Sequence, residues 1–151
     1  MSPATWYWLG TAGMVAGCVV FGLGAARSAE RHWQVLYQLN FFICLIAAGL
    51  YLLMATGYGT FTGQEGPGIK TTWIRYVTWG LSTPLLILDL TFLGRSKLPL
   101  VTALIGANTV MILTGFIATV LPEPLNYLWY VISCGAFAAI AAALIGPYRQ
   151  Q

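Results

Sequence analysis

Charged residues are scarce in this chain. Of its 151 residues, 7% are Asp, Glu, Lys or Arg, whereas 58% are hydrophobic. A soluble domain of this size cannot hide so much apolar surface. The three cysteines fall inside apolar runs without Cys-x-x-Cys spacing, and there is one histidine. The sequence therefore indicates neither a disulfide framework nor a metal site, and it shows no nucleophile–base pair.

Five apolar runs are long enough to cross about 30 Å of hydrocarbon. They predict an all-α membrane protein, an antiparallel helix bundle in a lipid bilayer, with spans near 5–25, 35–57, 73–93, 98–121 and 125–146. The first run begins with Trp6, Tyr7 and Trp8 and lacks a basic segment, so we interpret it as a retained helix with an aromatic anchor. The longest connection is rich in glycine and suits a hairpin between Thr60–Thr62 and Ile69–Thr72.

The basic residues predict the orientation of the helices in the membrane. Five follow the first, third and fifth spans, namely Arg27, Arg31, Arg95, Lys97 and Arg149. On the other side of the membrane only Lys70 and, within its helix, Arg75 are basic. Positive residues favour the cytoplasmic side, so we expect the N-terminus outside. The net charge of +3 then reflects topology, and nucleic acid is not an expected partner.

The third span contains polar groups that membrane helices seldom carry. At about 100° per residue, Ser82 lies about 40° from Thr78, Asp89 about 20° and Arg75 about 60°. These four residues therefore form one stripe about 21 Å long. Because a charge at the bilayer centre costs about 2.5–3.5 kcal/mol, the stripe is expected to face a protein interior or a water-filled path. The pattern indicates ion or proton handling.

A structural interpretation of the hydroxyl groups stays open at this point. Ser82 and Thr83 stand directly before Pro84, which cannot donate a helix hydrogen bond. Both hydroxyls can bond back to carbonyls of their own helix and help absorb a kink there. Asp89, surrounded by leucines, is expected to be uncharged at rest because burial disfavours a carboxylate.

The third span also carries a specific sequence arrangement. It reads R-Y-x-x-W-x-x-[ST]-T-P-L-L-x-x-D, and it resembles helix C of the microbial rhodopsins, which are seven-helix retinal proteins. The segments LYLLMATGYG (50–59), GANTVMILTG (106–115) and LWYVISCGAF (128–137) resemble parts of helices B, D and E. The resemblance implies that residues 1–151 are helices A to E of a single rhodopsin domain.

The resemblance also implies a binding site for all-trans retinal. Its residues would be Trp79 and Thr83 on one side, Met111 and Gly115 near the ring, and Tyr130, Ser133, Cys134 and Phe137 on helix E. Tyr51 and Arg75 would belong to the hydrogen-bonded region outside the Schiff base. The family's Schiff-base lysine lies in helix G, whereas the lysines here, Lys70 and Lys97, lie in connections. We therefore expect the covalent lysine outside these 151 residues.

Thr78 is the informative departure from the proton-pump pattern. Proton pumps of the resembled family have an aspartate there, which accepts the proton and balances the Schiff-base cation. Threonine can do neither, so a mobile anion is expected beside Thr78, Ser82 and Arg75. Thr78, Ser82 and Asp89 together resemble the cyanobacterial halorhodopsins, in which Asp89 would lie on the anion path.

The expected function is therefore light-driven inward pumping of chloride or another halide. The protein is expected to be a transporter and not an enzyme, and the family resemblance implies a homotrimer. The alternatives are a light-driven proton pump, a sensory rhodopsin or a non-photoactive membrane scaffold.

Overall fold

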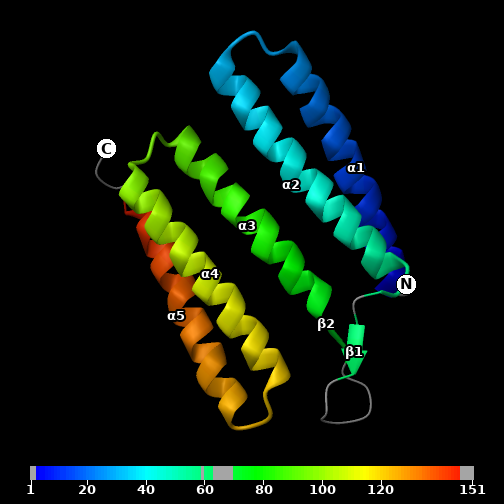
Figure 1. The fold of residues 1–151 in the computed structure, drawn as a ribbon, viewed down its shortest axis with the longest axis vertical. Coiled ribbons are helices and arrows are strands. Elements are labelled where there is room, and N and C mark those ends of the chain that lie inside the picture. Colours follow the sequence, from blue (N-terminus) through cyan, green and yellow to red (C-terminus); the bar gives the residue numbers. More distant parts are fainter. Residues whose placement is uncertain (1–2, 59, 63–69, 147–151) are drawn as a thin grey trace.

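A computed structural model describes residues 3–58, 60–62 and 70–146 (Figure 1). Its helices are α1 (Pro3–Arg27), α2 (Arg31–Ala55), α3 (Trp73–Leu93), α4 (Leu98–Val120) and α5 (Leu125–Ile145). The largest difference from the predicted spans is four residues, because α2 begins at residue 31 rather than 35. All five helices are long and apolar enough to cross a membrane, which confirms the all-α class.

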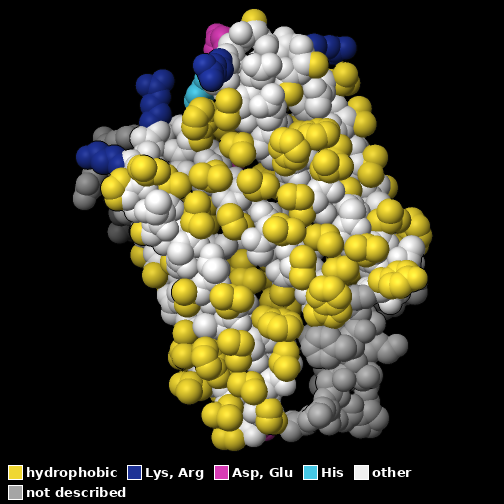
Figure 2. Space-filling model, in the orientation of Figure 1, with side chains coloured by type: hydrophobic (Ala, Val, Ile, Leu, Met, Phe, Trp, Pro, Cys, Tyr) yellow, Lys and Arg dark blue, Asp and Glu magenta, His cyan; other side chains and the backbone are white. Residues whose placement is uncertain are grey.

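The helices form a row in chain order. Each packs mainly against its sequence neighbours, and the most extensive contacts join α1 to α2 and α4 to α5 (Figure 1). We call the end of the bundle that carries the β-strands the hairpin end. The other end carries Arg27, Arg31, Arg95 and Lys97, and we call it the basic end. Figure 2 shows lysine and arginine side chains gathered at the basic end, above a largely apolar surface.

The predicted hairpin is present at the end of α2. β1 (Thr60–Thr62) pairs antiparallel with β2 (Lys70–Thr72), with Phe61 opposite Thr71. Gly57, at a φ of +85°, stops α2, because glycine adopts this backbone conformation at little cost. Two residues named in the predictions, Ile69 for the hairpin and Arg149 for the orientation, lie outside the described residues.

The buried core of α3, α4 and α5 lies toward the basic end. Ile87, Leu104 and Ile140 form a cluster there, one residue from each helix. Between membrane-spanning helices such side chains stabilise the bundle by van der Waals packing, because lipid tails are as apolar as they are. Toward the hairpin end the same three helices surround a cavity. The packing therefore holds α3 in place at one end and leaves space for a ligand at the other.

Candidate functional site

The predicted polar stripe lies on a side of α3 that approaches α2. Thr78 and Ser82 are buried, at 6% and 7% exposure, and Asp89 is half-buried. Arg75 is exposed at the hairpin end of the helix. Thr78 shares a cavity with Tyr51 of α2. The middle of the stripe is therefore covered by protein, whereas its first turn borders a cavity.

The hydroxyl groups of α3 bond back to their own helix. Thr78 Oγ1 donates to the Ile74 carbonyl at 2.9 Å, and Ser82 Oγ donates to the Thr78 carbonyl at 2.7 Å. Thr83 Oγ1 donates to the Trp79 carbonyl. This is the structural alternative that the sequence left open, and it describes these bonds correctly. A hydroxyl must rotate away from its carbonyl before it can donate to a ligand.

Asp89 has a partner on the neighbouring helix. The Nδ2 group of Asn40 donates to Asp89 Oδ1 at 3.0 Å and to the Leu36 carbonyl at 3.0 Å. Both amide protons are therefore used, and the carboxyl group is joined to α2 in the basic half of the bundle. Asn40 was not predicted as a site residue. The signal that could have found it is an amide side chain within an apolar span.

A cavity of about 340 Å³ lies at the hairpin end, between α1, α2 and α3. We call this cavity the vestibule. It is lined by Trp6, Tyr7, Gly10, Tyr51, Met54, Arg75, Thr78 and Trp79. Arg75 supplies the only charged side chain among these residues, and within the described part of the chain it forms no ion pair. Among the described lining residues, the vestibule therefore carries one positive charge and no negative charge.

The vestibule brings together four residues that the sequence analysis assigned to function and four that it did not. The assigned residues are Tyr51, Arg75, Thr78 and Trp79. The contributions of α1 were missed because Trp6 and Tyr7 were interpreted only as a membrane anchor.

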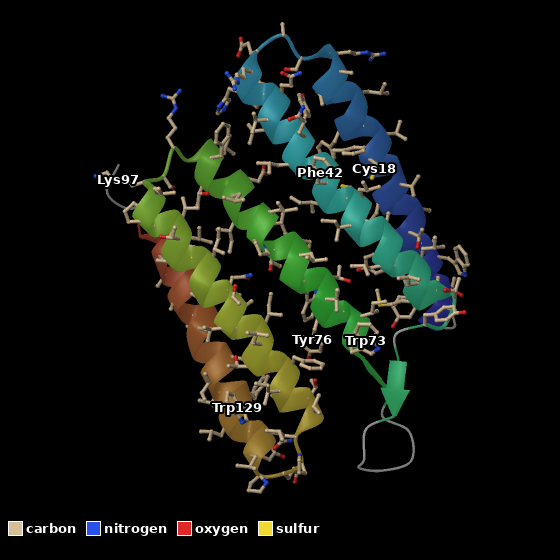
Figure 3. The ribbon with its side chains drawn as sticks, in the orientation of Figure 1. Cys18, Phe42, Trp73, Tyr76, Lys97 and Trp129 are labelled. Atoms are coloured by element: carbon tan, nitrogen blue, oxygen red, sulfur yellow. The ribbon has the colours of Figure 1, made fainter. Side chains whose placement is uncertain are left out.

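A second cavity, of about 630 Å³, lies between α3, α4 and α5. We call it the ring pocket. Seven of the eight residues that the resemblance assigns to retinal line it: Trp79, Met111, Gly115, Tyr130, Ser133, Cys134 and Phe137. Six further lining residues were not predicted: Tyr76, Ile112, Ala118, Thr119, Asn126 and Tyr127. The side of α3 that bears Tyr76 faces α4, where its ring lies 5.3 Å from that of Phe116 (Figure 3).

Thr83 is the assigned residue that lines neither cavity. Its Oγ1 accepts a hydrogen bond from Asn108 Nδ2 at 2.8 Å, which joins α3 to α4. Trp79, whose carbonyl accepts the Thr83 hydroxyl, borders both cavities. The vestibule and the ring pocket therefore meet at one indole, and Thr83 helps to fix the backbone that carries it.

The ring pocket suits a small apolar ligand. Its volume lies within the range of about 300–1,000 Å³ found for small-molecule sites, and aromatic and sulfur-containing side chains dominate its lining. The Ser133 hydroxyl is satisfied by the Met111 carbonyl at 2.8 Å. A Cβ atom at Gly115 would lie 3.2 Å from Ser133 Oγ, so the glycine keeps this part of the pocket open. The residues present therefore fit retinal.

The helices and the two cavities define the class of protein. Five apolar helices that pack in chain order, with a ligand-sized pocket toward one end, are those of a multi-pass membrane protein. The family model described as bacteriorhodopsin-like protein matches residues 1–151. The chain therefore belongs to the bacteriorhodopsin-like family.

Similar proteins include a bacteriorhodopsin from Haloterrigena sp., 39% identical over 97% of this chain. Among solved structures, a cyanorhodopsin from the cyanobacterium Calothrix sp. superposes with a TM-score of 0.87 at 39% identity, over 96% of the chain. The thermophilic rhodopsin of Rubrobacter xylanophilus gives a TM-score of 0.87 at 32% identity, over 95% of the chain. The chain spans 59% of the length of the first protein and 63% of each solved structure.

Proposed function

We propose that these residues are helices A to E of a seven-helix, light-driven pump that moves chloride or another halide inward. In this proposal the N-terminus and the hairpin end face outside, and the basic end faces the cytoplasm. The protein is a transporter rather than an enzyme. Assembly as a homotrimer belongs to the proposal on family resemblance alone.

Retinal is the proposed chromophore, and the ring pocket is its proposed site. Bound through a lysine, it would supply a protonated Schiff base, a cation whose direction changes with light. Lys97 lies at the basic end, at the opposite end of the bundle from Tyr76 (Figure 3). It precedes Met111 by 14 residues, which is about 21 Å along a helix, and Lys70 lies in the hairpin. We therefore propose that the lysine lies outside residues 1–151.

The observation that carries the anion proposal is the composition of the vestibule. Thr78 and Arg75 lie together there, and no carboxylate is among the described residues that line the cavity. A cation beside Thr78 would have no fixed anion among these residues, and an unpaired charge in a low-dielectric site is costly. A mobile halide can supply the missing charge. Arg75 attracts it, and the Thr78 hydroxyl can rotate to donate to it.

The same stripe of α3 supplies a route toward the basic end. Ser82 follows Thr78 by one helical turn, and both are buried. Asp89 lies further along, hydrogen-bonded to Asn40. An uncharged Asp89 would not repel a passing anion, whereas a carboxylate would. The proposal therefore requires that Asp89 be protonated while the anion passes.

Light-induced pH changes in cells that express the complete protein test this function. Inward chloride transport makes the cell interior negative and draws protons in passively, so a protonophore should enhance the alkalinisation of the medium. Active proton transport would instead be abolished by the protonophore.

A light-driven proton pump is the second candidate. Asp89 favours it, because proton pumps of the resembled family use a carboxylate at this place as a proton donor, and here Asn40 holds the group in position. Several relatives are also named bacteriorhodopsin. Thr78 opposes it, since a threonine cannot accept the proton at the other end of the path. The protonophore experiment separates the two candidates by the direction of its effect.

A further inference from the structure

The aromatic cluster at the start of α1 divides into two parts. Trp6 and Trp8 are both exposed, at 61% and 51%, as suits a membrane anchor, but Trp8 does not line the vestibule. Tyr7 is half-buried and lines the vestibule, as Trp6 does. The cavity that contains Arg75 and Thr78 thus has a wall from the first helix.

Tyr7 of this wall lies beside Tyr51 of α2. Their ring centroids are 6.5 Å apart and their planes are inclined by 42°. Neither phenol oxygen has a hydrogen-bond partner within the described part of the chain. A phenol O–H can donate to an anion. Two tyrosines whose phenol groups have no partner among the described residues therefore line the same cavity as Arg75.

Gly10 permits this arrangement. A Cβ atom at Gly10 would lie 3.1 Å from Cδ1 and 3.2 Å from Cε1 of Tyr51. Such contacts are tighter than ordinary packing, so any side chain there would push the Tyr51 ring by a few tenths of an ångström. The close approach of α1 to α2 at Gly10 thus determines where Tyr51 stands in the vestibule.

We propose that Tyr7 is a further anion-binding residue, and that with Tyr51 and Arg75 it forms an entry site for a small monovalent anion before the anion reaches Thr78. Gly10 is a positioning residue for this entry site. The volume of the vestibule corresponds to roughly ten water molecules at about 30 Å³ each. An anion can therefore enter with much of its hydration and exchange water for phenol donors. This inference rests on the proposed anion transport.

The test is rapid mixing of the halide-free, complete retinal-bound protein with chloride, with the visible absorption recorded over time. Tyr7→Phe removes one hydroxyl that would replace water around the entering anion, and we expect the rate constant of chloride binding to fall about tenfold, because hydrogen bonds to charged groups are strong. The equilibrium Kd for chloride and the absorption maximum at saturating chloride should not change, since the Thr78 site is intact. Tyr37→Phe is the matched control. Tyr37 pairs with Phe21 at the same 6.5 Å and 42°, away from the vestibule.

A second pair of variants tests the same site without altering Tyr7. Gly10→Ala should lower the rate constant of chloride binding about threefold or more, because it displaces the Tyr51 ring. Gly13→Ala should leave this rate constant unchanged, since a Cβ there would meet no atom of the described residues within 4 Å. If the Tyr7→Phe protein does not form pigment, this pair of glycine variants still tests whether the entry site exists.

The outcomes separate the entry site from the proposed function. Absence of any chloride response in the unmodified protein would overturn anion transport itself. A normal response there, with a rate constant of chloride binding in Tyr7→Phe within twofold of that of the unmodified protein, would overturn the entry site alone. An equal fall of this rate constant in Tyr7→Phe and Tyr37→Phe, or in the two glycine variants, would also overturn it.

Discussion

Replacing Thr78 with Asp places a negative charge in the vestibule, beside the site proposed for the halide. Because Thr78 lines the cavity, an anion bound there would lie about 4 Å from the new carboxylate. Two like charges at this distance repel by about 4 kcal/mol at an effective dielectric constant of about 20. That energy corresponds to a roughly thousandfold rise in the chloride Kd. Thr78→Asp should therefore abolish chloride binding in ordinary salt.

The assay is the chloride titration of the complete pigment at neutral pH, with Thr78→Asn as the uncharged control. Asparagine has nearly the size of aspartate and still donates a hydrogen bond, so its Kd should rise much less. Light-driven transport should also change, from inward chloride movement toward outward proton movement. A chloride Kd that is the same in Thr78→Asp and in the unmodified protein would refute the placement of the halide beside Thr78.

Two further predictions concern the ring pocket and the basic half of the bundle. Gly115→Val should prevent or strongly slow pigment formation, because its side chain would enter the pocket against Ser133. Gly106→Val, in open space on the same helix, should not slow it. The visible absorbance after addition of retinal measures pigment formation in both variants. Asn40→Leu leaves Asp89 without its amide donor and should lower the free energy of unfolding by about 0.5–2 kcal/mol. Denaturant unfolding measures that loss, and unchanged stability would show that the hydrogen bond contributes nothing.

The helices and their order could be predicted from the sequence. The length of an apolar run predicts a membrane span. Such a span must be helical here, because backbone groups without hydrogen bonds are costly in hydrocarbon. Most of the lining of the ring pocket could also be predicted, since the residues of α3, α4 and α5 that resemble the family's retinal site line one cavity. Only Thr83 is absent from its lining; its hydroxyl instead accepts a hydrogen bond from Asn108 of α4.

The contacts between helices could not be predicted from a periodic pattern. Periodicity gives the face on which a residue lies, but not which residue of another helix it meets. The bond from Asn40 to Asp89 and the approach of Gly10 to Tyr51 both depend on the relative height of adjacent helices. The place of Tyr7 in the vestibule lining was missed for another reason, since an aromatic residue near a membrane surface is ordinarily an anchor.

The central claim is that a chromophore cation without a carboxylate at position 78 recruits a halide. Its most direct test is titration of chloride into the complete retinal-bound protein, prepared free of halide, while the visible absorption is recorded. The account predicts a saturable shift of the absorption maximum that sulfate of equal ionic strength does not produce. An absorption band that is the same with and without chloride would contradict it.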